Sequence, residues 1–142
     1  MTVVVDANLV VVLVNGNPRR EQAWRQFQDW MDRGINIHAP NLAFYEIANA
    51  LTRLIAAGFF PEERLAEAWN FIYALPITYH PFPDGTRIIE IALSLQRNSA
   101  YDAAYLALAE SLDAQLWTLD GPLYRNAVAR GFPVRLLGNT EP

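Results

Sequence analysis

The stretch YDAAYLALAESLDAQLWTLD, residues 101–120, holds the pattern from which the fold can be worked out. Ser99 stands just before it, where a serine can cap a helix that carries residues 101–110. Residues 115–118 (QLWT) predict a strand, and Asp120 follows that strand by two positions. The stretch therefore predicts a helix leading into a strand. Asp102 lies in the first turn of the helix, and Asp120 lies just beyond the strand.

The same alternation extends over the rest of the chain. Further strands are predicted at residues 3–5, 35–39 and 77–79, with residues 134–136 as an edge strand. Helices are predicted at 19–33, 41–57, 61–75, 84–95 and around 123–132, after a short helical turn from about Asn8. We expect Asn41 and Asp84 to cap their helices. Short strands alternating with helices predict an α/β sandwich, with helices on both faces of a parallel sheet.

Helical spacing also predicts which side chains face the core. The expected inner faces are Trp24, Phe27 and Met31; Phe44, Ile47, Ala48, Leu51 and Ile55; Leu65, Ala68, Trp69 and Ile72; and Ile88, Ile91, Ala92 and Leu95.

Length and composition indicate one domain over residues 1–142. Apolar residues make up 52% of the chain, which is enough for a core, and no repeat or linker interrupts it. The apolar opening is broken by Asp6 and Asn8 and does not resemble a leader, and no run is long enough to span a membrane. We expect a soluble, cytoplasmic protein. Cysteine is absent, which excludes disulfides, zinc–thiolate sites and thiol nucleophiles.

The formal net charge of -4 does not favour a nucleic-acid partner. However, all 11 basic residues are arginine, the better side chain for binding phosphate oxygens. Charge therefore decides little.

Four acids are predicted to meet at one edge of the sheet. Asp6 follows its strand directly and Asp120 follows its strand by two positions, so both lie at the carboxyl end. Glu46 lies about one turn into the helix after the second strand, and Asp102 begins a helix that runs back from the same edge. Open α/β sheets bind their ligands at this edge.

Such a cluster is unstable without a counter-ion. Two carboxylates about 4 Å apart repel by roughly 4 kcal/mol at an effective dielectric near 20. An all-oxygen site suits a hard cation, Mg²⁺ or Mn²⁺, better than zinc.

Each acid also has a simpler interpretation. Asp6 could start a turn, and Glu46 could belong to a solvated helix face with Arg53. Asp102 and Asp120 could be helix caps. Only their common edge favours a site.

The stretches VVVDANLVV, YEIANAL, YDAAYLALAE and TLDGPL, in this order and spacing, resemble the PIN domain, in particular the VapC toxins of toxin–antitoxin pairs. The resemblance covers nearly the whole chain, and YDAAYLALAE with the following strand and TLD is its most specific part. It implies a three-layer sandwich with a central parallel sheet of about five strands. It also implies a magnesium-dependent endoribonuclease.

Position by position, the resemblance implies that Asp6, Glu46, Asp102 and Asp120 are the catalytic, metal-binding acids. Asn8 and Thr118 match polar residues that support the site. The implied reaction is hydrolysis of RNA by metal-activated water, with 5′-phosphate and 3′-hydroxyl products. An antitoxin partner and a homodimer are also implied.

Two other functions are consistent with the residues. One is a non-catalytic protein-interaction domain of the same fold, in which the acids are caps and surface charges. The other is an enzyme with an aspartyl nucleophile; the chain has Asn8 where such enzymes carry a second acid, and it has no lysine.

Several other residues are expected to be structural. His38 and His80 need no catalytic role, and Arg53 and Arg97 are expected on the surface or in ion pairs. The aromatic residues Trp24, Trp30, Trp69 and Phe71 are expected to pack on helix faces, with some of them available to an oligomer or antitoxin surface.

Overall fold

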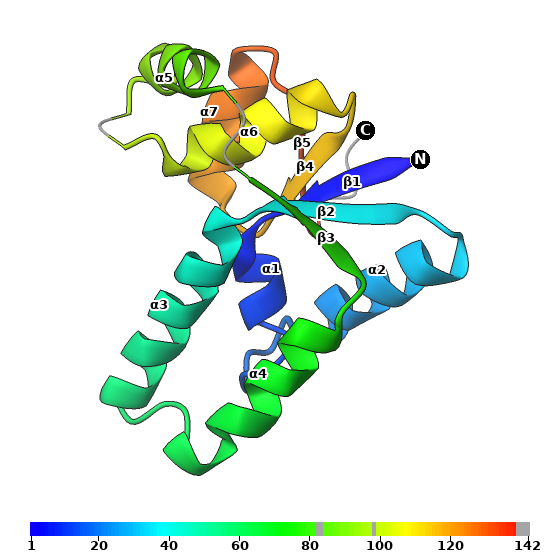
Figure 1. Cartoon of the computed structure of the whole chain (residues 1–142), viewed down its shortest axis with the longest axis vertical. Helices are drawn as coiled ribbons and strands as arrows, with labels where there is room; N and C mark the ends of the chain where they lie inside the picture. The colour runs from blue at the N-terminus through cyan, green and yellow to red at the C-terminus, as the bar shows by residue number, and fades with distance from the viewer. Residues whose placement is uncertain (82–83, 98, 139–142) are drawn as a thin grey trace.

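A five-stranded sheet forms the centre of the molecule (Figure 1). The computed structural model describes residues 1–81, 84–97 and 99–138. The strands are β1 (Thr2–Val5), β2 (Asn36–Pro40), β3 (Ile77–His80), β4 (Gln115–Thr118) and β5 (Val134–Leu136). Their order is β3-β2-β1-β4-β5, and every pair is parallel. The predicted parallel α/β fold is confirmed.

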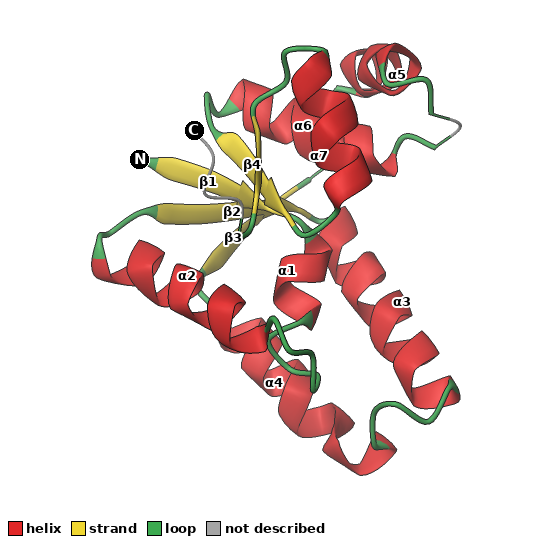
Figure 2. Ribbon diagram, turned by 180° about the vertical axis from the view of Figure 1, so that it is seen from behind, coloured by secondary structure: helices red, strands yellow, loops and turns green. Residues whose placement is uncertain are grey.

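Helices cover the sheet on both sides (Figures 1 and 2). One side carries α5 (Gly85–Ser94), α6 (Tyr101–Ser111) and α7 (Gly121–Ala129). The other carries α1 (Ala7–Val11), α2 (Arg20–Asp32) and α4 (Leu65–Ala74), the last preceded by the 3-10 turn η1 (Glu62–Arg64). The helix α3 (Leu42–Ala56) leaves the carboxyl edge of β2 and projects with α4 away from the sheet. The arrangement has the three layers predicted.

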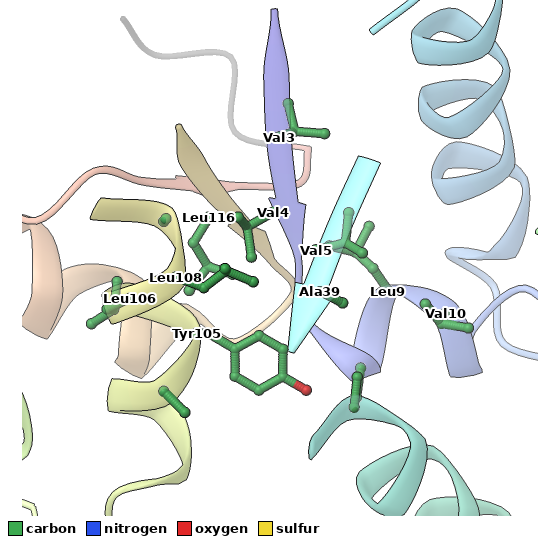
Figure 3. Packing of buried hydrophobic residues seen from close by; sticks show 14 of the residues in the cluster. Val3, Val4, Val5, Leu9, Val10, Ala39, Tyr105, Leu106, Leu108 and Leu116 are labelled. Atoms are coloured by element: carbon green, nitrogen blue, oxygen red, sulfur yellow. The ribbon is translucent and has the colours of Figure 1, made fainter. Parts of the chain in front are cut away.

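The central position of β1 follows from its sequence. Its three valines are buried, as expected for a strand covered on both faces. Figure 3 shows Val4 directed toward Leu106 and Leu108 of α6, whereas Val5 points the opposite way, toward Leu9 of α1. Strand alternation thus attaches both helical layers to β1.

Three predictions of buried residues were wrong. Met31 of α2 is 36% exposed, and Trp30 is buried in its place. Both lie at helical spacing from Phe27, but the Trp30 ring packs edge-on against Phe27 and Trp117, with centroids 5.3 and 5.4 Å apart. Ala48 and Leu65 are also exposed, because a groove of about 470 Å³ lies between α3 and α4 where they project from the sheet.

The predicted helix caps are only partly correct. Asp84 caps α5, accepting hydrogen bonds from the backbone N–H groups of Thr86 and Arg87. Asn41 makes no side-chain capping bond to α3. Ser99 accepts a bond from the Tyr101 N–H at 3.3 Å, but Ala100 is the capping residue of α6. None of the helices in the described ranges is both long enough and apolar enough to span a bilayer.

Candidate metal and phosphodiester site

A pocket of about 390 Å³ opens at the carboxyl edge of the sheet, beside the ends of β1 and β4. The sequence predicts four acids at this edge, and in the structure all four line this pocket. The acids are Asp6, Glu46, Asp102 and Asp120, and Asn8 lines the pocket with them. They come from four separate elements, which only the fold brings together.

A hydrogen-bond network fixes Asp6 at the end of β1. The Thr118 hydroxyl donates to Asp6 Oδ2 at 2.8 Å, and Asn8 Nδ2 donates to the same oxygen at 3.2 Å. Thr118 is fully buried and also accepts hydrogen bonds from Asn8 Nδ2 and from the Asp120 N–H. Asn8 Oδ1 accepts from the Leu119 N–H. Thr118 and Asn8 therefore connect the loop after β4 to the loop after β1 through hydrogen bonds that include Asp6; their role in supporting a site stays a prediction.

Asp120 has two structural features at once. Its Oδ1 accepts a hydrogen bond from the Leu123 N–H at 3.0 Å, so it caps α7, and Pro122 stands in the first turn. Its side chain also lines the pocket. The cap interpretation and the site interpretation are therefore compatible.

Glu46 is held by a residue that sequence reasoning missed. The hydroxyl of Tyr105 donates to Glu46 Oε1 at 2.6 Å, although the two residues are 59 positions apart. Tyr105 is 1% exposed, and Figure 3 shows its ring directed from α6 past β1. Burial and the nearby carboxylates Asp6 and Glu46 raise the pKa of Tyr105, so the hydroxyl stays a donor.

Burial and mutual repulsion disfavour the charged forms of Asp6 and Glu46. Burial raises the pKa of Asp6, the Thr118 hydrogen bond lowers it, and the charges of Glu46 and Asp102 raise it; together they bring the pKa to about 7. Burial also raises the pKa of Glu46, opposed by the Tyr105 hydrogen bond and reinforced by Asp102. A bound cation would relieve both effects.

Arg97 acts electrostatically on Asp102. Burial raises the pKa of Asp102, the charge of Arg97 lowers it, and Asp120 raises it. From the sequence we expect Arg97 on the surface or in an ion pair; in the structure it is half-buried, and its charge favours the ionised form of Asp102.

The residues present fit a hard divalent cation that keeps part of its water shell. Every side chain that faces the pocket with a charge is a carboxylate, and oxygen ligands are what Mg²⁺ and Mn²⁺ prefer. Within residues 1–81, 84–97 and 99–138, no three acidic or histidine side chains lie close enough together to form a ready-made metal cluster. An open ring of acids is the arrangement expected for Mg²⁺, which binds through few carboxylates and several waters.

The two histidines lie outside the pocket. His38 Nδ1 and His80 Nε2 are 2.6 Å apart across β2 and β3, and their rings are tilted against each other. Burial, followed by the neighbouring His80, lowers the pKa of His38. The pair joins two strands, in keeping with the structural role expected.

The aromatic residues mostly pack as predicted. Trp30 is buried, and Trp24 and Trp69 are partly buried against the core. Phe71 is 36% exposed and contacts Trp24, with ring centroids 5.7 Å apart. Arg53 is exposed on α3.

Comparison with known proteins agrees with this architecture. The model of the PIN domain family matches residues 3–129. Ribonuclease VapC3 of Pyrobaculum aerophilum is 35% identical over 128 residues, which cover 87% of this chain and 92% of that protein. Ribonuclease VapC1 of Mycobacterium tuberculosis H37Rv is 36% identical over 101 residues, covering 70% of this chain and 71% of the relative.

Solved structures share the fold at lower identity. PAE2754 from Pyrobaculum aerophilum superposes with a TM-score of 0.71 at 19% identity, covering 96% of this chain and 90% of that chain. VapBC2 from Rickettsia felis, solved bound to a DNA fragment from its promoter, superposes with a TM-score of 0.69 at 12% identity. The match covers 96% of this chain and 98% of that chain. The family match spans most of the chain and the matched relatives are VapC proteins, so the chain belongs to the PIN-domain family and, within it, to the VapC toxin–antitoxin group.

Proposed function

We propose that this protein is a magnesium-dependent endoribonuclease that hydrolyses RNA phosphodiester bonds at the four-carboxylate pocket. The observation that carries the proposal is the convergence of Asp6, Glu46, Asp102 and Asp120, from four separate elements, on one pocket. The matched relatives are named ribonucleases, which supports the same reaction and substrate.

The carboxylates of Asp6, Asp102 and Asp120 would hold Mg²⁺, directly or through water, and Mn²⁺ would substitute for it. A bound ion of this kind polarises a phosphoryl oxygen and lowers the pKa of a water molecule. Glu46 would ligate or act as the base that receives the proton of the attacking water. Tyr105 orients Glu46, and Thr118 and Asn8 orient Asp6.

The reaction needs no side-chain nucleophile. Water attacks phosphorus and gives a proton to the base, the bond from phosphorus to the 3′ oxygen breaks, and that oxygen takes a proton from solvent to leave as a 3′-hydroxyl. The products carry 5′-phosphate and 3′-hydroxyl ends.

We also propose that the protein acts as the toxin of a toxin–antitoxin pair in the cytoplasm. In this proposal a cognate antitoxin covers the acidic pocket, and the chain forms a homodimer. Solved neighbours of VapBC type support an antitoxin partner.

The test combines metal binding with cleavage. Wild-type protein is expected to melt at a higher temperature when Mg²⁺ or Mn²⁺ is added, since an ion that binds only the folded state stabilises it. It is also expected to cleave members of a panel of structured RNAs, with end sequencing giving the predicted termini.

Asp102→Asn should remove the metal-dependent shift and lower cleavage by about 100-fold or more, the scale of losing one electrostatic element of an active site. The matched control is Asp29→Asn, which removes an exposed acid on α2 that pairs with Arg33. It should behave like the wild type. If neither Mg²⁺ nor Mn²⁺ changes the melting temperature of the wild type and no RNA is cut, the chain is a non-catalytic interaction domain of this fold.

A further inference from the structure

A second pocket, of about 410 Å³, lies next to the carboxylate pocket, between the loop after α1 and helix α4. The two pockets share Asn15 in their walls. A strand of RNA that crosses the carboxylate pocket therefore has this second pocket beside it. Consecutive phosphates of an RNA strand lie close together. The phosphate next to the scissile one is therefore the group that would reach the second pocket.

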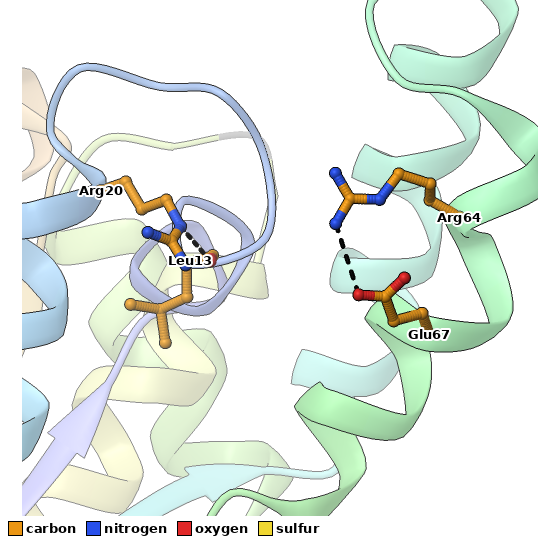
Figure 4. A network of polar contacts seen from close by, with 4 residues as sticks. All are labelled: Leu13, Arg20, Arg64 and Glu67. Carbon is orange, nitrogen blue, oxygen red and sulfur yellow. Dashed lines mark hydrogen bonds and ion pairs between the residues drawn. The ribbon is translucent and has the colours of Figure 1, made fainter.

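Two arginines line this pocket from opposite sides (Figure 4). Arg20 comes from the first residue of α2, and Arg64 from the turn before α4. Arg20 Nε donates to the Leu13 carbonyl at 2.8 Å, and this bond fixes the guanidinium at the pocket wall. Within the described residues Arg20 forms no ion pair, so its charge has no carboxylate partner there.

The one acid in this pocket neutralises Arg64 only weakly. Arg64 Nη2 lies 3.4 Å from Glu67 Oε1, and both side chains are well exposed, at 64% and 74%. An exposed pair of this kind contributes little, so a phosphate can replace it. The pocket therefore has a net positive charge, whereas the neighbouring pocket is strongly negative.

The rest of the lining suits a nucleotide. Phe60 and Phe71 add apolar surface to the pocket, and the Phe71 ring is partly exposed. Proteins bind single strands by combining arginines for the backbone with aromatic rings on which bases stack. Arginine is also the better side chain for holding a phosphate by two oxygens.

We propose that Arg20 and Arg64 bind a phosphate of the RNA strand next to the scissile bond. This inference rests on the proposed ribonuclease function. Asn15, shared by both pockets, lies between this phosphate and the scissile one. The two arginines supply attraction for RNA that the net charge of -4 does not provide.

The experiment measures binding of fluorescent decauridylate by anisotropy over a series of salt concentrations. It uses an Asp102→Asn background in EDTA, so that cleavage does not interfere. Arg20→Gln/Arg64→Gln should weaken binding about 10-fold or more. The slope of log affinity against log salt should fall by about 0.7 for each phosphate that is no longer neutralised. The single variant Arg64→Gln removes an exposed side chain and should fold normally, with a fall in slope of about 0.7. In the active protein, the double variant should raise KM for RNA and leave Mn²⁺ binding unchanged.

The matched control is Arg33→Gln, which removes an exposed arginine from the opposite end of α2. If the arginine variants bind decauridylate with the affinity and salt slope of this control, the phosphate site is wrong. That result would also follow if the pocket received an acidic segment of a partner protein instead. It would leave the ribonuclease proposal intact, provided that wild-type protein still cuts RNA in a metal-dependent way. Absence of wild-type cleavage and metal binding would overturn both proposals.

Discussion

Replacing Asp6 with asparagine should make the metal-free protein more stable at neutral and alkaline pH. Burial and the charges of Glu46 and Asp102 raise the pKa of Asp6 from 3.8 to about 7. The folded protein therefore holds a proton on Asp6 that the unfolded chain releases above about pH 4. The contribution of the Asp6 proton to the free energy of unfolding is fully present below pH 3.8 and is lost progressively as the pH rises to about 7.

The size of the effect follows from the same values. A rise from 3.8 to about 7 corresponds to about 4 kcal/mol of unfolding free energy, at 1.36 kcal/mol per pKa unit. Solvent in the pocket screens part of this, so we expect Asp6→Asn to gain about 2 to 4 kcal/mol at pH 8 and almost nothing at pH 4. The amide keeps an oxygen that can accept the Thr118 hydrogen bond, so the gain should not be offset by an unpaired hydroxyl.

Urea unfolding in EDTA, followed from about pH 4 to about pH 8.5, measures this difference. Adding Mn²⁺ at about 100 times its Kd should then stabilise the wild type by about 2.7 kcal/mol and leave Asp6→Asn unchanged. Asp29→Asn serves as control and should follow the wild type at every pH. If the curves of wild type and Asp6→Asn run parallel over the whole range, Asp6 is not a strained carboxylate and the electrostatic basis of the site is wrong.

Three further substitutions test the parts of the site. Tyr105→Phe removes the hydroxyl that donates to Glu46 and should lower kcat about 10-fold. KM should change little, because the loss misorients the Glu46 carboxylate and Tyr105 itself does not contact RNA; circular dichroism should show an intact fold. Thr118→Val leaves the Asp120 N–H without its acceptor and removes one of the two hydrogen bonds to Asp6 Oδ2. It should cost about 2 kcal/mol in urea unfolding, and a cost below about 0.5 kcal/mol would contradict the network. Arg97→Gln removes the charge that lowers the pKa of Asp102 and should weaken Mn²⁺ binding more at pH 6 than at pH 8, measured by calorimetry; an equal loss at both pH values would argue against this coupling.

The strands and the edge at which the acids meet could be predicted because they depend on local signals. Three consecutive valines define β1, and an acid that follows a strand must lie at its carboxyl end. The direction of parallel strands then brings Asp6 and Asp120 to the same edge without any knowledge of tertiary contacts.

Other features depend on contacts that no local signal contains. The hydrogen bond between Tyr105 and Glu46 depends on how α6 is oriented relative to α3. Within the sequence, Tyr105 cannot be distinguished from any other aromatic residue of the core. The choice between Trp30 and Met31 on α2 depends on the position of Trp117 in β4, 87 residues later in the chain. A helical pattern tolerates either residue on the inner face, so the tertiary neighbour decides.

The Thr118–Asp6 hydrogen bond joins residues 112 positions apart, and this separation determines when the pocket can form during synthesis. The first acid is made at the start of synthesis, but its partner hydroxyl and the last acid arrive only with β4 and the loop beyond it. A ribosome-bound chain that ends before that loop lacks Asp120 and β5, so it has neither the complete sheet nor all four acids. The pocket is therefore complete only after β4 and the loop beyond it have been made and have folded against β1.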